Sequence, residues 1–344
     1  MIRNLVKAAV GLPLFTRRML DRQGATIVVC YHDVRAPQDP PSWMRPDTDL
    51  FTRQLQWFAG VGRFIGPQDL GVPDERGELR ILITFDDGYR NNHRLAWPLL
   101  RRFQAPALFF VSTAHLLDGE PFWFDRATGP LLHSDATKLD LGAHGLGAIT
   151  LRRRPPAARW DDIDGFLRSL KVLGPADDPR VAAIIESVES QLPAAALVVR
   201  EACRPLSVAE LREMAADPDC HFGSHGHEHD ILVRLPDAGL RRSLSESRRI
   251  LTDLLGAPVN DLAYPNGDFG PRERQAALDS GYTRGFSVRA QAVRPDGDPM
   301  GVPRLLVGGF DGPAVLGYRV NRILMARARS IAPAGAQASR SPTS

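Results

Sequence analysis

The feature that most limits how this chain can fold is a short apolar run that ends in two adjacent carboxylates. Residues 79–85 are mostly apolar and include β-branched residues, and Asp86, Asp87 and Gly88 follow them directly, so the pattern predicts a buried strand over 79–85. Two carboxylates at the open end of a buried strand repel each other unless a proton or a cation lies between them. One could then bind a divalent metal while the other acts as a base. The alternative is a plain turn, because Asp and Gly are common turn residues.

A histidine-rich stretch downstream supplies candidate metal ligands. His225, His227 and His229 fall within five residues, in a chain that has 9 histidines. Neutral imidazole is the commonest side-chain metal ligand, and two histidines with one carboxylate form a common catalytic metal set. A helical turn would place His225 and His229 on one face, whereas a strand would place all three there. The alternative is a polar surface loop whose histidines bind nothing.

Strand and helix patterns alternate along most of the chain. Besides 79–85, we expect strands over 26–31, 106–112, 261–264, 283–288 and 302–307, a short strand before His225, and helices between them. This alternation implies parallel pairing with crossover helices, and therefore an α/β sheet or barrel. Chemistry in such folds collects at the carboxyl ends of the strands. His32, Asp86, Asp87 and His225 all fall there.

One long segment interrupts this alternation. Residues from about 114 to 206 carry two helical patterns, over 160–170 and 181–192, and we expect a helical insertion that covers part of the barrel rim without forming an autonomous second domain. The segment begins with an aromatic patch, Phe122 to Phe124. This patch is either a lip that faces the substrate or part of the core, and base rates for aromatic residues favour the core.

The two ends of the chain are basic. Residues 1–25 are expected to form a basic arm whose apolar run is too short to span a bilayer. Three interpretations of this arm stay open: a signal segment without a cleavage site, a helix on the membrane surface, or an arm that packs on the domain. The pattern over 313–331 predicts a basic amphipathic helix, which either contacts an anionic membrane or docks on the core. The composition of 332–344 predicts a disordered tail.

Composition restricts the partners and the compartment. A net charge of +3 gives no argument for nucleic acid. The three cysteines have no metal or disulfide spacing, and Cys30 is most simply a small buried apolar residue. Because no clear export signal is present, we expect a cytoplasmic protein, at the inner face of the membrane if the basic ends bind lipid. A periplasmic location stays open.

Several of these stretches resemble the polysaccharide deacetylases, the NodB-homology group of carbohydrate esterases. The similar stretches are 31–34, 84–88, 105–111, 225–229 and 263–267, and the similarity runs from about Ile27 to about Val307. The resemblance implies a distorted (β/α) barrel over 26–312. It also implies that Asp87, His225 and His229 hold a divalent metal, usually zinc in this family, and that Asp86 is the general base. His227 corresponds to a variable position and is expected not to bind.

The third and last motifs of that family are incomplete in this chain. Ala263 replaces an arginine that would orient the catalytic aspartate, and Asn266 replaces an aromatic residue. The resemblance still implies that Tyr264, Pro265, Asn266 and Gly267 lie against the substrate, with the peptide N–H near Asn266 as an oxyanion donor. Residues 303–307 stand where a histidine acid would be. The tryptophan of the fourth motif is not identifiable.

A histidine on the first strand offers a substitute for the missing acid. Tyr31 to Val34 resembles the first strand of deacetylases that act on poly-N-acetylglucosamine, where the last motif has moved to the front of the chain. The first and last strands of a closed barrel are neighbours, so this permutation leaves the histidine in place. We therefore expect His32 to protonate the leaving amine, oriented by Asp33. The alternative is a structural role for His32.

These expectations converge on a metal-dependent hydrolase that removes N-acetyl groups from an amino sugar in a polysaccharide or oligosaccharide, such as an exopolysaccharide or a cell-envelope glycan. One alternative is a deacetylase or deformylase of a lipid-linked sugar, which the basic ends favour. Another is a catalytically silent barrel that only binds glycan. The missing arginine and tryptophan argue for the silent barrel, and the intact set of Asp86, Asp87, His225 and His229 argues against it.

Overall fold

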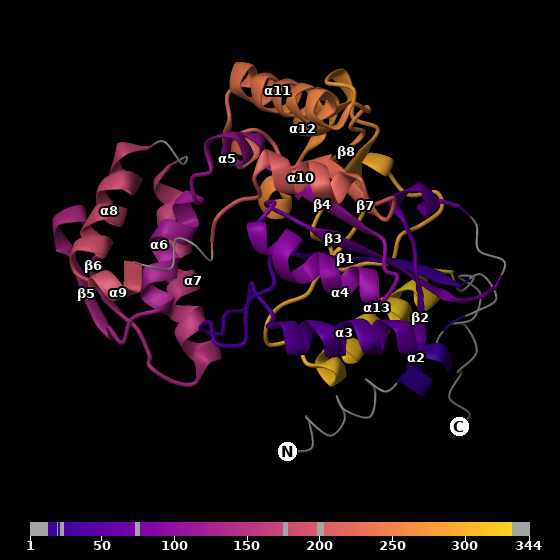
Figure 1. Cartoon of the computed structure of the whole chain (residues 1–344), viewed down its shortest axis with the longest axis horizontal. Coiled ribbons are helices and arrows are strands. Elements are labelled where there is room, and N and C mark those ends of the chain that lie inside the picture. The colour runs from indigo at the N-terminus through magenta and orange to yellow at the C-terminus, as the bar shows by residue number, and fades with distance from the viewer. Residues whose placement is uncertain are drawn as a thin grey trace, which may run out of the picture.

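The centre of the molecule is a curled parallel sheet (Figure 1). The computed structural model describes residues 13–18, 20, 24–72, 76–174, 178–197 and 203–331. The sheet has the strand order β10-β1-β3-β4-β7-β8-β9, and β2 also pairs with β3. The strands are β1 (Ala25–Tyr31), β2 (Gly62–Phe64), β3 (Leu79–Phe85), β4 (Ala107–Val111), β7 (Cys220–Ser224), β8 (Asp261–Ala263), β9 (Arg284–Phe286) and β10 (Leu305–Leu306). The pairings between these strands are parallel, as predicted.

The sheet curls until its two ends approach each other. β1 pairs with β10, with Val29 opposite Leu305, and a single parallel bridge joins Phe286 of β9 to Val302 just before β10. The predicted distorted (β/α) barrel is therefore confirmed, and so is the predicted contact between its first and last strands. β10 is shorter than the predicted strand over 302–307.

Side chains on the strands alternate between two cores, as the period of a strand requires. On β1, Ile27, Val29 and Tyr31 face the covering helices, whereas Val28 faces the interior of the barrel. The helices around the barrel are α2 (Pro13–Arg18), α3 (Thr48–Val61), α4 (Trp97–Arg102), α10 (Val208–Ala215), α11 (Asp237–Leu255), α12 (Pro271–Asp279) and α13 (Pro313–Ile331).

Residues 123–197 form an insertion lobe beside the barrel (Figure 1). After α5 (Thr113–Asp118), the lobe contains α6 (Trp123–Leu132), β5 (Lys138–Leu141), β6 (Gly147–Thr150), α7 (Pro156–Leu173), α8 (Pro179–Ser190) and α9 (Ala194–Leu197). It has its own hydrophobic cluster, in which Ile163, Phe166 and Ile184 are buried. The expectation of a helical insertion is therefore corrected in one respect, because the lobe also includes an antiparallel hairpin. That it forms no autonomous second domain stays a prediction.

The C-terminal helix docks on the main core. Leu316, Val320, Ile323 and Leu324 of α13 are buried in the cluster that covers the barrel, and α13 packs against α2 and α3. The core-docking alternative is therefore what the structure shows. The predictions for residues 1–12 and for the tail 332–344 lie outside the described residues. In the part that the structure describes, no helix has the length and apolar character needed to cross a bilayer.

Candidate active site

A tight turn after β3 presents the two carboxylates at the mouth of the barrel. Asp87 and Gly88 both have positive φ, 73° and 84°. A Cβ on Gly88 would meet the Val111 side chain at 3.0 Å, so a side chain there would be strained as well as crowded. Asp86 and Asp87 are both buried. The turn and the pair of buried carboxylates are thus the same feature, and the predicted turn does not exclude a role for the carboxylates in chemistry.

Two histidines approach Asp87 from the end of β7 and from the loop that follows. The Nε2 atoms of His225 and His229 lie 3.4 and 3.0 Å from Asp87 Oδ1. The donor atoms of the three residues all lie within 4.8 Å of one another. The structure therefore brings together Asp87, His225 and His229, which were the three predicted ligands.

The protonation of His225 follows from its other ring nitrogen. His225 Nδ1 lies 2.8 Å from the carbonyl oxygen of Ala263, and a carbonyl only accepts, so Nδ1 carries the proton. In neutral His225 the Nε2 lone pair then points at Asp87. Burial lowers the pKa of His225, but Asp86 and Asp87 outweigh it and raise that pKa, so either a proton or a metal cation can lie between the two acceptors. Ala263, which occupies the position of the family's arginine, thus contributes its carbonyl group as the orienting partner of a candidate ligand.

The charges around Asp87 also suit a cation. Burial by itself raises the pKa of Asp87, but His229 and His225 outweigh it and hold that pKa well below its usual value. Burial lowers the pKa of His229 to about 4, so its imidazole is neutral at pH 7. Apart from these two histidines, neither oxygen of Asp87 has a hydrogen-bond partner in the described residues. A buried carboxylate and neutral imidazoles form a donor set that fits a divalent metal.

Arg304 is the site residue that the sequence did not reveal. It is fully buried, and its Nη1 and Nη2 atoms donate to Asp86 Oδ1 and Oδ2 at 2.6 and 2.8 Å. Its Nε donates to the Ser287 carbonyl at 3.0 Å, and its guanidinium lies 5.3 Å from the Phe110 ring. Arg304 immediately precedes β10, and β10 is next to β1. It therefore supplies from the last strand the orienting arginine that is missing at Ala263.

Cys30 also contacts Asp86. Cys30 is buried, as predicted, and its Sγ also donates to Asp86 Oδ2 at 3.3 Å. Burial raises the pKa of Cys30 well above its ordinary value, which keeps it a neutral donor. For Asp86, burial raises the pKa but Arg304 and His225 outweigh it, so the pKa is lowered and Asp86 is ionised at pH 7.

His32 and Asp33 point in different directions at the end of β1. His32 lines the same cavity as Asp86 and Asp87, and burial lowers its pKa. Asp33 instead accepts hydrogen bonds from the Val34 N–H at 2.8 Å and from Asn91 Nδ2 at 3.4 Å. The expectation that Asp33 orients His32 is therefore wrong, because consecutive residues of an extended segment face opposite sides.

The residues of the third motif, 263–267, face two different parts of the molecule. Asn266 and Gly267 line the cavity, and Asn266 has a positive φ of 62°. The Tyr264 hydroxyl instead donates to the Met300 carbonyl at 3.0 Å, and its ring stacks on Phe269. Pro265 is buried beside them. The structure thus brings Asn266 and Gly267 to the cavity and places the Tyr264 side chain in the core.

The aromatic patch is also divided between two roles. Phe122 is fully buried, whereas Phe124 lines the cavity with its ring centroid 5.0 Å from that of His229. The patch therefore belongs partly to the core and partly to the cavity wall.

His227 lies outside the cluster of candidate ligands, because its Nδ1 pairs with the Thr113 hydroxyl at 2.8 Å.

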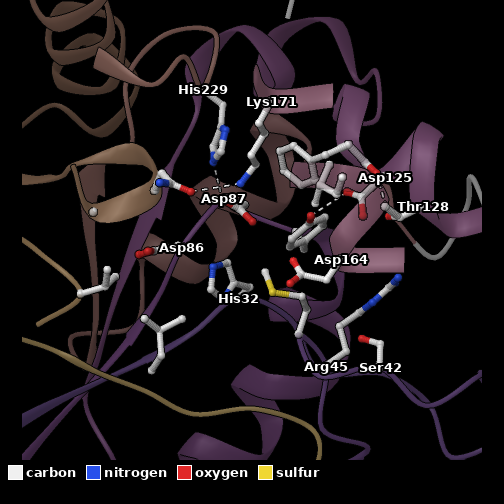
Figure 2. Close-up of a pocket in the computed structure, with 18 of the residues that line it drawn as sticks. His32, Ser42, Arg45, Asp86, Asp87, Asp125, Thr128, Asp164, Lys171 and His229 are labelled. Atoms are coloured by element: carbon white, nitrogen blue, oxygen red, sulfur yellow. Dashed lines mark hydrogen bonds and ion pairs between the residues drawn. The ribbon is translucent and has the colours of Figure 1, made fainter. Parts of the chain in front are cut away.

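These side chains surround a cavity of about 290 Å³ (Figure 2). One wall is the barrel mouth, with Asp86, Asp87 and His32, and the other comes from α6 and α7 of the insertion lobe. The two walls are joined where Lys171 Nζ of α7 donates to Asn266 Oδ1 at 3.0 Å. The candidate catalytic groups thus lie in a pocket that both parts of the chain build.

Comparison with known proteins agrees with this geometry. Residues 74–285, more than half of the chain, match the family model "Polysaccharide deacetylase". A curated relative, poly-beta-1,6-N-acetyl-D-glucosamine N-deacetylase of Staphylococcus aureus, is 26% identical over 110 residues. That match covers 30% of this chain and 38% of the relative.

Solved structures show the same fold. IcaB from Ammonifex degensii has 22% identity and a TM-score of 0.53, over 87% of this chain and 98% of that one. The Streptococcus pyogenes deacetylase PplD has 16% identity and a TM-score of 0.53, over 86% of this chain and 97% of that one. From the matched family model, the barrel and the residues at its mouth, we conclude that this chain belongs to the polysaccharide deacetylase family.

Proposed function

We propose that the protein hydrolyses the N-acetyl group of an amino sugar in a glycan, with a divalent metal held by Asp87, His225 and His229. The observation that carries this proposal is the convergence of the three donor groups within 4.8 Å, beside a carboxylate that Arg304 orients. The relative from Staphylococcus aureus, named for deacetylation of poly-β-1,6-N-acetyl-D-glucosamine, supports the choice of substrate.

We propose zinc as the metal. Two neutral imidazoles and one carboxylate, with room for further ligands in a cavity, are a donor set that suits catalytic zinc. When bound, such a metal lowers the pKa of a water molecule to about 7 and polarises the carbonyl of an amide. His225 is held for this task by its hydrogen bond to Ala263, and Asp87 by the turn after β3.

Asp86 would act as the general base. It lines the cavity next to Asp87 but is not one of the three clustered donors, so it stays free to accept a proton. Arg304 holds both of its oxygens and thereby fixes the plane of the carboxylate. The missing arginine was one of the two arguments for a silent glycan-binding barrel, beside the tryptophan that is not identifiable. Because Arg304 fills that role from a different strand, we favour the active enzyme.

His32 would protonate the leaving amine, and the segment after β8 would stabilise the oxyanion. His32 lines the cavity from the neighbouring strand, next to Asp86 and Asp87. The Gly267 N–H already donates to the Tyr264 carbonyl at 2.8 Å, so we assign the oxyanion contact to the peptide N–H of Asn266.

The direct experiment is to measure release of acetate from short β-1,6-linked N-acetylglucosamine oligomers by the metal-loaded protein. We expect acetate from the native chain and none after the metal is removed by a chelator, with recovery on addition of zinc. An N-formylated sugar tested in parallel distinguishes deacetylation from deformylation. A metal-loaded protein that releases neither acid from any of these sugars would contradict the proposal.

We also propose peripheral contact with an anionic membrane surface through α2, which would place the protein at the inner face of the membrane. Leu14 is 63% exposed, Phe15 is 36% exposed, and Arg17 and Arg18 lie beside them on this short helix. Apolar side chains next to basic ones suit the boundary of an anionic bilayer. Sedimentation with anionic vesicles should decrease in the Leu14→Ser, Phe15→Ser double variant. Equal sedimentation with neutral vesicles would contradict this assignment.

A further inference from the structure

The insertion lobe contributes a regular row of side chains to the cavity. Trp160, Asp164, Leu167 and Lys171 all line it, and on α7 these positions are separated by 4, 3 and 4 residues. Such spacing places them on one face of a helix. α7 therefore lies along the pocket with a single stripe facing inward, and the stripe combines a flat apolar part with polar ends.

The end of the cavity opposite Asp86 is polar and buried (Figure 2). Ser42 is 1% exposed, lines the cavity, and its hydroxyl has no hydrogen-bond partner in the described residues. Arg45 and Asp125 lie at the same end and are each 9% exposed. A buried hydroxyl without a partner is unfavourable, so Ser42 marks a place where a bound molecule supplies one.

The charge at this end is already balanced within the protein. Arg45 Nη1 lies 3.8 Å from Asp33 Oδ2, and Asp125 acts on Arg45 electrostatically as well. Asp125 in turn accepts a hydrogen bond of 2.6 Å from the Tyr89 hydroxyl. Burial raises the pKa of Asp33 to about 7 and that of Asp125 to about 6, so these carboxyl groups and Arg45 leave little net charge at this end, and a neutral group suits it. Hydroxyl groups, which both donate and accept, match these three residue types.

We propose that this cavity is a binding site for one neutral, hydroxyl-rich sugar unit at the end of a chain, and that the insertion lobe determines this specificity. The inference rests on the proposed function: the acyl group lies at Asp86 and Asp87, and the sugar hydroxyls lie at Ser42, Arg45 and Asp125. The cavity of about 290 Å³ is at the lower end of the range of about 300–1,000 Å³ for ligand pockets, which suits one such unit. Residues of α6 and α7 in the lobe line the side of this cavity that lies across from the barrel mouth.

The test is a calorimetric titration of the full-length, zinc-loaded Asp86→Asn variant, which binds without turnover. The probes are N-acetylglucosamine with a methyl aglycone, its β-1,6-linked pentamer, and a phosphorylated form of the single sugar. We expect the single sugar and the pentamer to bind within about threefold of each other, because only one unit contacts the protein. The phosphorylated sugar should bind at least about tenfold more weakly, because its charge would lose its water at an end of the cavity where Arg45 is already paired with Asp33.

Two further variants test whether the lobe and the polar end of the cavity contribute to binding. Leu167→Trp should abolish binding of both neutral probes by filling the cavity, and Ser42→Ala should weaken both by about tenfold, the loss expected for one buried hydrogen bond. Ser245→Ala, an exposed serine on α11, is the matched control and should bind as the parent does. The melting temperature of each variant shows whether it is folded.

The outcomes separate this inference from the proposed function. Affinity that rises about thirtyfold or more with chain length, or no binding of any probe, would overturn the terminal-unit site. Equal binding of the neutral probes, with no acetate release by the native enzyme, would refute the proposed reaction and leave the binding site intact.

Discussion

The two walls of the cavity are built on different principles. On the barrel wall, side chains such as Asp86, His225 and Arg304 are almost fully buried, and each is held by another named group. On the lobe wall, Trp160, Asp164, Leu167 and Lys171 come from one helix that packs on a separate core. The barrel wall thus carries the proposed chemistry and the lobe wall carries the proposed recognition. Since the cores are separate, the two functions should respond separately to substitution.

The largest expected effect lies on the barrel wall, at the proposed base. Asp86→Asn should lower turnover of an acetylated oligosaccharide by about 10² to 10⁴-fold, the usual contribution of a general base. Metal content should stay near that of the native protein, because Asp86 is outside the cluster of three donors. Measuring turnover and metal content on the same preparation checks both expected results. Retained turnover in this variant would remove Asp86 from the base role.

The next largest effect should come from the arginine behind the base. Arg304→Met should lower stability by about 3–5 kcal/mol, because Asp86 would be left as a buried charge without its partner. Urea unfolding measures this loss. Arg274→Met, which removes an exposed pair with Asp298, is the matched control and should cost only about 0–1 kcal/mol. Similar losses in the two variants would contradict the buried pairing.

A smaller effect, confined to the lobe, tests whether the two cores are separate. Ile184 is 2% exposed in the lobe core, so Ile184→Ala should destabilise that core by about 2–5 kcal/mol. Hydrogen exchange should then speed up in α7 and α8 while β3 stays protected, and KM should rise with metal content unchanged. Exchange that increases equally in β3 would show that lobe and barrel unfold as one unit.

The barrel could be predicted because its strands are short apolar runs with clear ends. β3 was predicted at its observed bounds, Leu79–Phe85. The hairpin in the lobe was missed because Gly142, Gly145 and Gly147 weaken its pattern.

Arg304 was missed for a different reason. It is a charged residue next to a strand of only two residues, and its partner Asp86 is 218 positions away. The available signal was the arginine within the apolar run 303–307, combined with the expected pairing of the first and last strands. The lobe wall has no comparable signal in the sequence. The face of α7 that lines the cavity is set by how the lobe packs against the barrel.

The most direct test of the account is the metal content of the purified protein by elemental analysis, beside the variants His229→Ala and His227→Ala. The two histidines are two positions apart, but only His229 faces Asp87, whereas His227 pairs with Thr113. We predict close to one divalent metal per chain in the native protein and in His227→Ala, and loss of that metal in His229→Ala. No metal in the native protein after reconstitution with zinc, or equal metal in both variants, would contradict the proposed site.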